Sequence, residues 1–496
     1  MGIKAALSVP FARLVVKRIR RKAMRPQEAQ ERVLKHLIRK AASTQFGTDH
    51  GFGTITSHAD FVKQIPVRDY EQLKSYVIKA VEGESDILWP GKPLYFCKTS
   101  GTTSGAKYIP LTRASMPNHI HSARNALLSY IAETGDASFV NGKMIFLQGS
   151  PEMDKLDSGL PFGRLSGIVA NHVPAYLQRN RMPSYKTNCI DDWEEKVEAI
   201  VEETTQEDMS LISGIPSWVQ MYFEKILEKT GKSSIQEVFP NFSLFVYGGV
   251  NFEPYRQNFE RLIGRKIPHI ELYPASEGFI AYQDTQKEEG MLLTVDSGIF
   301  YEFIKAEEFF DDNPRRYMVH EVEIGVNYVI ILSTNAGLWG YNIGDTVRFT
   351  SLIPPRIRVT GRIKHFTSAF GEHVIGEEVE QAMQKTAERF GLVVSEFHVA
   401  PQTNPAVGLP FHEWLVEGDQ VEFSNEALDY LDQLMQDQNP YYKDLIVGNV
   451  LRPLVVTTLS SGAFNNHMKS IGKLGGQNKV PRLSNDRKIA ESLLAQ

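Results

Sequence analysis

The sequence predicts an α/β protein with two domains, and three observations support this. The chain has 496 residues, which exceeds the size at which one hydrophobic core keeps growing. Between residues 143 and 273, strand-length apolar segments alternate with amphipathic helical segments, a pattern typical of layered α/β sheets with mostly parallel strands. From 279 to 349, shorter β segments follow one another, so we expect a second, antiparallel sheet or a barrel-like part there.

Composition excludes several classes of protein. Hydrophobic residues make up 42% and charged residues 23% of the chain, as in ordinary globular proteins. The net charge of −5 gives no overall basic field, so we expect no nucleic-acid partner. Cys97 and Cys189 are too few for a disulfide framework, and no apolar run approaches the roughly 20 residues of a membrane-spanning helix. We therefore expect a cytoplasmic protein.

The N-terminal segment is both apolar and basic. Residues 3–25 fit either weak contact with an anionic membrane surface or a solvated basic face on a helix docked to the protein. The next segment, 26–43, has apolar residues at helical spacing and predicts an amphipathic helix. Most cations of the first segment gather in its second half: Lys17, Arg18, Arg20, Arg21, Lys22 and Arg25.

The most informative stretch is 92–112, KPLYFCKTSGTTSGAKYIPLT. It predicts a buried strand ending at Phe96, then a polar loop, then a helix from Thr112 to Glu133. Glycines, hydroxyls and backbone N–H groups in the loop, together with a mobile lysine, suit a polyphosphate. A plain surface turn is the alternative, because the loop matches neither G-x-x-x-x-G-K-[ST] nor G-x-G-x-x-G. The candidate ligands are Thr99, Ser100, Gly101, Thr102, Thr103, Ser104 and Lys107.

Helices and strands are expected to alternate after this loop. Ligands of such sheets gather at the carboxyl ends of the strands, where three candidate loops lie: 99–107, 248–251 and 274–278. The expected strands are 143–147, 209–213, 243–247 and 268–273, and the expected helices are 191–205, 216–229 and 253–263.

A domain boundary is predicted at Gly361-Arg362. Residues 1–360 would form the large N-terminal domain, and 361–496 a small α+β domain after a hinge near 361–364. In the small domain we expect helices at 376–390 and 425–436 and strands at 393–400, 412–417 and 450–456.

Several stretches, taken in order, resemble one known family. TSGTTSGAKYIPLT is similar to the first phosphate motif of the adenylate-forming superfamily, YPASEG to its second, YNIGDTVRF to its ribose motif and TGRIKHF to its hinge. The close of the chain, GGQNKVPRLSND, resembles the Lys-x-Pro-Arg of one branch, the Gretchen Hagen 3 family of acyl-acid amido synthetases. This resemblance spans about residues 30 to 490, and we expect a bacterial-type member.

The resemblance implies a fold and a reaction. Family members have a large N-terminal domain of stacked α and β layers and a small C-terminal domain that swings between two half-reactions. A carboxylate attacks the α-phosphate of ATP, which releases pyrophosphate and leaves an acyl-adenylate. An amine, usually of an amino acid, then attacks the acyl carbon and expels AMP.

The resemblance also implies roles for individual residues. The loop hydroxyls, amides and Lys107 would meet the β- and γ-phosphates, and Glu277 would hold Mg²⁺ together with phosphate oxygens; the alternative for Glu277 is a carboxylate at a helix N-terminus. Asp345 would accept hydrogen bonds from the ribose, or else be a turn residue bonded to its own backbone. The adenine pocket would be lined by Tyr273, Ala275, Ser276, Gly248 and Gly249.

Two cations are expected to meet the α-phosphate and pyrophosphate. These are Arg362 at the hinge and Lys479 in the small domain; as isolated residues, both would be ordinary solvated charges. The chain departs from the plant pattern at Gly371-Glu372-His373, where we align an Asp-Lys pair, so a lysine contact made there in the family is in doubt. Two other functions stay open: thioester formation with coenzyme A, and a non-catalytic nucleotide-binding or membrane-surface protein.

Overall fold

The computed structural model describes residues 3–99, 107–172, 179–190, 192–249, 252–363, 366–367, 369–370, 372, 374–418, 421–448, 450–474 and 479–496. The chain divides into two compact units, which we call unit 1 (Met1–Gly249 and Ile267–Arg358) and unit 2 (Val250–Lys266 and Val359–Gln496). Unit 2 thus includes a helix from earlier in the sequence, α13 (Glu253–Ile263). The predicted swing of a C-terminal domain stays a prediction.

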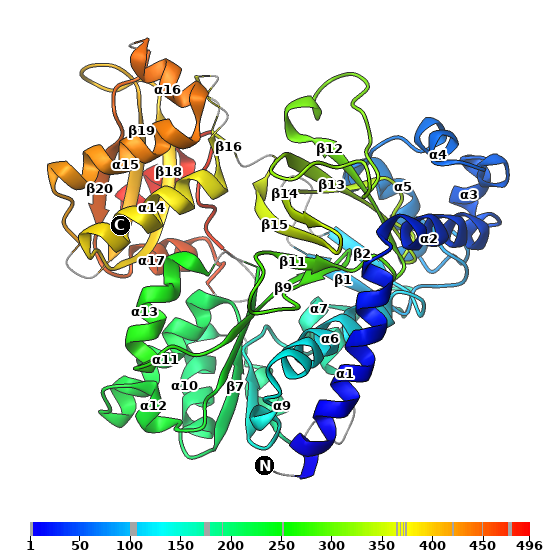
Figure 1. Ribbon diagram of the computed structural model, residues 1–496, viewed down its shortest axis with the longest axis horizontal. Helices are drawn as coiled ribbons and strands as arrows, with labels where there is room; N and C mark the ends of the chain where they lie inside the picture. The colour runs from blue at the N-terminus through cyan, green and yellow to red at the C-terminus, as the bar shows by residue number, and fades with distance from the viewer. Residues whose placement is uncertain are drawn as a thin grey trace. The chain divides into compact units, whose positions relative to one another are not determined.

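Unit 1 contains the helices and strands of the N-terminal part of the chain (Figure 1). Its helices are α1 (Ile3–Ala23), α2 (Pro26–Ala41), α3 (Gln45–Asp49), α4 (His58–Gln64), α5 (Tyr70–Val81), α6 (Met116–Thr134), α7 (Leu165–Ala170), α9 (Tyr185–Asn188), α10 (Trp193–Thr204), α11 (Pro216–Thr230) and α12 (Ile235–Val238). Its strands are β1 (Tyr95–Thr99), β2 (Lys107–Leu111), β3 (Lys143–Phe146), β4 (Asp154–Lys155), β5 (Pro161–Gly163), β6 (Arg181–Met182), β7 (Met209–Ser213), β8 (Leu244–Gly248), β9 (His269–Ala275), β10 (Gly278–Tyr282), β11 (Met291–Leu293), β12 (Ile299–Lys305), β13 (Asn327–Thr334), β14 (Tyr341–Leu352) and β15 (Pro355–Arg362), the last of which continues into unit 2.

One large sheet organises unit 1. Among the described strands it has 11 members in the order β12-β13-β14-β15-β11-β10-β9-β8-β7-β3-β6. From β6 to β9 the neighbours are parallel, as the alternating pattern predicts. The pairings β9–β10, β10–β11, β11–β15, β14–β13 and β13–β12 are antiparallel. These strands continue the same sheet, because β9 pairs with β8 on one edge and β10 on the other. The expectation of a separate second sheet is therefore wrong.

Strands β12 and β13 lie at one end of the sheet order but are almost wholly buried. Almost every residue in both is buried, which requires cover on both faces. Helix α2 covers part of β12 through Gln30, a buried polar residue. Its amide donates to the carbonyls of Val295 (2.8 Å) and Ile299 (3.0 Å) and accepts from the N–H of Tyr301 (2.8 Å). This side chain therefore replaces the hydrogen bonds that the strand end would otherwise lack.

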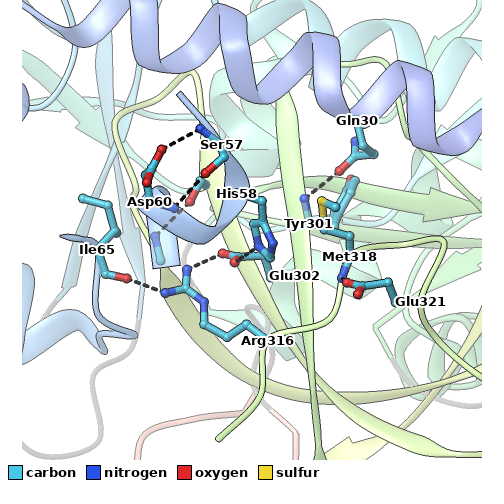
Figure 2. A network of polar contacts seen from close by, with 12 residues as sticks. Gln30, Ser57, His58, Asp60, Ile65, Tyr301, Glu302, Arg316, Met318 and Glu321 are labelled. Atoms are coloured by element: carbon cyan, nitrogen blue, oxygen red, sulfur yellow. Dashed lines mark hydrogen bonds and ion pairs between the residues drawn. The ribbon is translucent and has the colours of Figure 1, made fainter. Parts of the chain in front are cut away.

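A buried ion pair fastens α4 to the same strand (Figure 2). Glu302 of β12 is fully buried and pairs with Arg316, while His58 Nε2 lies 2.7 Å from its other oxygen. Arg316 also donates to the carbonyl of Ile65 at the end of α4. Burial alone would raise the pKa of Glu302, but Arg316 and His58 outweigh it and lower that pKa. The carboxylate therefore stays charged inside the protein.

Unit 2 is a small sheet covered by helices. Its described elements are α13, β16 (Phe366–Thr367), β17 (Val374–Ile375), α14 (Gly376–Phe390), β18 (Val394–Gln402), β19 (Phe411–Gly418), α15 (Asn425–Gln438), α16 (Pro440–Val447), β20 (Val455–Leu459), α17 (Ala463–Ser470) and α18 (Lys488–Leu494). In the sheet β18-β19-β20, β18 and β19 are antiparallel and β19 and β20 parallel. The predicted last strand, 450–456, is wrong in its start: β20 begins at Val455, where the backbone first pairs with β19.

Within the part of the chain described, no helix is both long and apolar enough to cross a membrane.

Candidate active site

The predicted phosphate loop joins the two strands of a hairpin. Thr99 of β1 pairs with Lys107 of β2, so the expected helix after the loop is preceded by a strand. Pro110 makes this strand hard to predict from the sequence, but a proline without an N–H is tolerated in an edge strand, and β2 is the edge of its sheet. Helix α6 then starts at Met116 instead of Thr112. The loop residues Ser100, Gly101, Thr102, Thr103 and Ser104 lie outside the described residues.

Lys107 lies at the base of the loop. Its ammonium is 5.6 Å from the centre of the Tyr70 ring, within the range of a cation–π contact. The Tyr70 hydroxyl accepts a hydrogen bond of 2.9 Å from the N–H of Tyr108. The cation is therefore attached to a paired strand next to an aromatic ring from α5, and is less mobile than a loop lysine would be.

Ser276 and Glu277 form the tight turn of the hairpin β9–β10. Ala275 pairs with Gly278 across it, so Glu277 precedes a strand, and the alternative of a helix N-terminus is wrong. Asn118 of α6 holds the strand two residues further on: Phe279 N–H donates to Asn118 Oδ1 (2.7 Å), and Asn118 Nδ2 donates to the Phe279 carbonyl (3.1 Å). The helix that follows the phosphate hairpin thus fixes the turn that carries Glu277.

The same turn lies beside β1. Cys97 of β1 is fully buried, and burial together with the negative charge of Glu277 raises the pKa of its thiol, while a hydrogen bond with Ser276 opposes this shift. The strand leading into the phosphate loop and the turn of the YPASEG motif are therefore neighbours. Two of the predicted motifs meet here.

Asp345 meets the same region through Tyr273. The Tyr273 hydroxyl donates to Asp345 Oδ2 over 2.6 Å, a short bond of the kind formed with a charged acceptor. The sequence predicts Asp345 in a turn before a strand, but in the structure it lies within β14, at an irregularity in the pairing with β13. Gly344 enables this irregularity with φ +87°, and its N–H donates to Asn342 Oδ1 (2.8 Å).

The Tyr273–Asp345 bond shows that the antiparallel half of the sheet curls. Three strands, β10, β11 and β15, lie between β9 and β14 in the sheet order. In a flat sheet the two strands would be about 19 Å apart at roughly 4.8 Å per step, too far for a tyrosine and an aspartate to meet. The curl therefore brings the YPASEG and YNIGDTVRF motifs to one place.

The glycines after β8 have a packing role. A side-chain carbon on Gly248 would lie 2.6 Å from the carbonyl oxygen of Leu272 in β9, so only glycine permits this close pairing of β8 and β9. Gly249 has φ +86°, which favours glycine. Their predicted contact with adenine, like that of Tyr273, Ala275 and Ser276, stays a prediction.

Lys479 and Arg362 belong to unit 2. Arg362 is the exposed last residue of β15, and Lys479 is exposed near the start of the final described segment. Two residues that follow Lys479 closely are bonded to Val399 of β18. Val399 N–H donates to the Arg482 carbonyl (2.8 Å), and Ser484 N–H donates to the Val399 carbonyl (3.0 Å). The segment that begins with Lys479 is therefore attached to β18.

Arg482, the arginine of the KVPR motif, has a structural role that the sequence does not reveal. Its guanidinium donates to Glu396, to Glu380 (3.4 Å) and to the Tyr255 hydroxyl (3.0 Å). Burial opposes its charge, but Glu396, Tyr255 and Glu380 raise its pKa. Because Tyr255 comes from α13, this arginine joins the chain's end to a helix far away in the sequence. These partners lie far from Arg482 in the sequence, so no local pattern predicts the contacts.

Glu372, in the stretch where the chain departs from the plant pattern, is fully buried. It accepts from the Phe370 N–H (2.8 Å) and lies 2.8 Å from His412 Nε2. Burial would raise its pKa, but His412 outweighs this effect and lowers it. Glu372 therefore anchors this stretch. Gly371 and His373 lie outside the described residues.

A magnesium site would need ligands from the substrate. Within the described part of the chain, no group of three or more His, Cys, Asp or Glu side chains is arranged to hold a metal ion. Mg²⁺ commonly takes one or two carboxylates together with phosphate oxygens and waters. Glu277, half-buried in a fixed turn, fits that donor set when ATP supplies the remaining oxygens.

Family comparisons cover most of the chain. The GH3 family N-terminal domain matches residues 15–191 and 163–268, the GH3 family central domain matches 292–362, and the GH3 family C-terminal domain matches 377–488. The chain belongs to the GH3 family. This GH3 protein is accordingly an adenylate-forming acyl acid amido synthetase, a ligase.

Individual relatives of this GH3 protein are distant. It is 21% identical to jasmonoyl–L-amino acid synthetase JAR4 of Nicotiana attenuata, over 91% of the chain and 90% of the relative. It is 22% identical to jasmonoyl–L-amino acid synthetase GH3.5 of Oryza sativa subsp. japonica, over 92% of each. The structure of AtGH3.15 acyl acid amido synthetase in complex with 2,4-DB has a TM-score of 0.79 at 17% identity, covering 98% of this chain and 95% of the other. A 2-hydroxyisobutyryl-CoA ligase in the postadenylation state reaches 0.58 at 14% identity, covering 97% and 93%. These structures share the fold.

Proposed function

We propose that this GH3 protein joins a small carboxylic acid to the amine of an amino acid in two ATP-dependent half-reactions. In the first, an oxygen of the carboxylate bonds to the α-phosphorus of ATP, and the bond from that phosphorus to pyrophosphate breaks. In the second, the amine bonds to the acyl carbon, the bond to AMP breaks, and the amine loses a proton. Membership of an amido synthetase family supports amide formation over thioester formation.

The observation that carries this proposal is the Tyr273–Asp345 hydrogen bond of 2.6 Å. It joins the second phosphate motif to the ribose motif, and the turn that follows Tyr273 adjoins the strand leading into the first phosphate motif. One nucleotide contacting all three motifs requires this convergence. We assign Asp345 to the ribose hydroxyls, with Tyr273 fixing the carboxylate.

The chemistry explains why the site combines donors and cations. A carboxylate approaching a triphosphate is repelled, so the protein must supply positive charge and oriented donors where charge develops. We assign Ser100, Thr102, Thr103 and Lys107 to the β- and γ-phosphates. Mg²⁺ held by Glu277 and phosphate oxygens would supply further positive charge.

Arg362 and Lys479 complete the proposed set of cations. We assign both to the α-phosphate and pyrophosphate in the first half-reaction. The attachment of Pro481 and Arg482 to β18 supports Lys479, because a lysine next to fixed backbone has fewer conformations to lose when it binds an anion. Once pyrophosphate has left, we expect Lys479 to have no further role.

The acid and the acceptor can be found in two steps. A library of carboxylic acids is screened for acid-dependent exchange of labelled pyrophosphate into ATP, and each active acid is then incubated with amino acids or with coenzyme A. We expect exchange with at least one acid, and AMP release that depends on an amino acid. Product formed only with coenzyme A would replace amide synthesis by thioester formation. Failure of exchange with every acid, together with no ATP binding by calorimetry, would contradict the proposal.

A further inference from the structure

The outward face of α1 has an apolar half and a basic half. The helix buries Ala5, Ala12, Val16 and Ala23 against unit 1, and α6 is its main neighbour (Figure 1). At 100° per residue, the opposite side carries Leu7, Phe11 and Leu14, which are 67%, 51% and 53% exposed, and then Arg18 and Arg21, which are also exposed. Arg25, exposed too, lies just beyond the end of the helix.

The two halves form one continuous stripe. Leu7, Phe11, Leu14, Arg18 and Arg21 follow one another at intervals of three or four residues, which keeps them on one side of the helix. Arg25 follows two residues after the helix ends at Ala23. No acidic residue precedes Glu28, so nothing on α1 neutralises its cations. Lys22 pairs with Asp296 and Arg25 lies 3.6 Å from Glu28, but Arg18 and Arg21 are exposed cations in an acid-free helix.

Folding alone does not explain this stripe. Cations in the last turn of a helix are favoured by its dipole, which accounts for Arg20, Arg21 and Lys22. The dipole does not account for Leu7, Phe11 and Leu14, whose exposure to water is unfavourable. Contiguous exposed apolar side chains beside a charged region are typical of a surface that binds a partner.

Charge identifies the partner. We propose that the outward face of α1 binds the surface of an anionic lipid bilayer. Leu7, Phe11 and Leu14 span about 10 Å of the helix and would enter the boundary between headgroups and acyl chains, as amphipathic helices do to a depth of about 5–10 Å. Arg18, Arg21 and Arg25 would contact anionic headgroups. Because both halves share one side, the helix would tilt with its N-terminal half deeper.

A second copy of the chain is a poorer partner for this face. In a parallel pair of α1 helices the arginines of one copy would meet those of the other, and like charges repel. In an antiparallel pair the apolar half would meet the arginines and remove their solvation without a counter-charge. Only a partner that is apolar in one region and anionic in the adjacent one matches both halves, as a lipid surface does.

The test is sedimentation of the full-length protein with vesicles. One set contains about 30% phosphatidylglycerol in phosphatidylcholine and the other is phosphatidylcholine alone. We expect binding to the anionic vesicles, weakened by salt because it depends on exposed charges. Replacing Arg18, Arg21 and Arg25 together with alanine should weaken binding about a hundredfold. Leu7→Gln, Phe11→Gln and Leu14→Gln together should weaken it by at least about tenfold.

A matched control removes three exposed lysines elsewhere, Lys232, Lys266 and Lys488, by alanine substitution, and should bind like the wild type. Thermal unfolding and pyrophosphate exchange without vesicles should be unchanged in all three triple variants, which separates this proposal from the catalytic one. Absence of binding to anionic vesicles would overturn it. Wild-type binding by either α1 variant would also overturn it. A dimer detected by light scattering and lost only in the glutamine variant would overturn it in favour of a second copy of the chain. Binding of polyglutamate as tight as vesicle binding would overturn it in favour of an acidic polypeptide.

Discussion

Replacing Tyr273 with phenylalanine tests the link between the two nucleotide motifs. The substitution removes only the hydroxyl that donates to Asp345 Oδ2 over 2.6 Å. The ring stays, and with it the packing of a side chain that is 7% exposed. Asp345 keeps its charge but loses the bond that orients its carboxylate. If this carboxylate accepts from the ribose, ATP should bind more weakly.

The expected size of the effect follows from the kind of hydrogen bond lost. Bonds to charged groups contribute about 1.5–3 kcal/mol, and about 1.4 kcal/mol corresponds to a factor of ten. We therefore expect the KM for ATP in pyrophosphate exchange to rise by about 10- to 100-fold. The kcat should change little, because the ribose contact is equally present before and during phosphoryl transfer.

The control is Tyr301→Phe, another buried tyrosine. Its hydroxyl lies 2.8 Å from Thr294 Oγ1 and donates to the Ile280 carbonyl over 3.3 Å, so this variant should lose about 1 kcal/mol of stability and keep the KM for ATP. A double-mutant cycle with Asp345→Asn completes the test, because two residues that act through one bond give non-additive losses. An unchanged KM in Tyr273→Phe, or additive losses in the cycle, would refute the reasoning.

Three further variants test other parts of the chain. Glu277→Gln should fold normally and lose about 100- to 1,000-fold in pyrophosphate exchange, with Glu288→Gln as an exposed control; full exchange at low Mg²⁺ would contradict the metal role. Lys479→Ala should lose exchange yet convert supplied acyl-adenylate to amide at nearly the wild-type rate, with Lys488→Ala as control; equal losses in both assays would contradict a role limited to adenylation. Glu302→Gln should lower the free energy of unfolding in urea at pH 7 by about 3–5 kcal/mol, because it leaves Arg316 buried without a counter-charge. The pKa of Glu302 is lowered in the folded protein, so this difference should be fully present above the ordinary glutamate pKa and shrink as pH falls through the folded value; a difference that grows in acid would contradict the assignment.

Periodicity predicted most of the regular elements. Strand Met209–Ser213 and helices Glu253–Ile263 and Gly376–Phe390 have the expected bounds. In these segments the side-chain pattern alone is sufficient, because burial follows the period of the backbone. Strands β2 and β10 were not predicted: β2 is short and contains Pro110, and β10 is a short strand after a polar turn. β10 is buried along its whole length, so it has no alternation to detect.

Long-range polar contacts could not be predicted in the same way. Arg482 bonds to Tyr255, 227 positions away, and Tyr255 to Glu396, 141 positions away. These contacts place α13 in unit 2, although its own pattern fits the alternation of the N-terminal part. The Glu302–Arg316 pair is similar, because a charged residue inside an apolar strand gives no sign of its partner. Such contacts depend on tertiary packing, which no local pattern encodes.

The candidate site could be predicted in part because its residues lie where the sheets are interrupted. The phosphate loop joins two paired strands, Glu277 lies in a tight turn, and Asp345 follows a glycine of positive φ at an irregularity in β14. At such points backbone N–H groups are released from the strand ladder and can face a ligand. Glycine and small polar residues permit these conformations, so the interruptions are visible in the sequence.

The remaining requirement is that the interruptions meet, and here the curl of the sheet is decisive. A glycine at positive φ and an irregular register both bend a strand and increase its twist, so the feature that exposes Asp345 also helps to bring β14 toward β9. The 2.6 Å bond from Tyr273 then fixes the approach. If this is correct, Gly344→Ala should do more than remove a flexible residue. Alanine is strained at the φ of +87° that Gly344 adopts, so the substitution should move Asp345 away from Tyr273. The effect of Gly344→Ala on the KM for ATP should therefore largely disappear in a Tyr273→Phe background. An effect of the same size in both backgrounds would mean that Gly344 acts independently of the Tyr273–Asp345 bond.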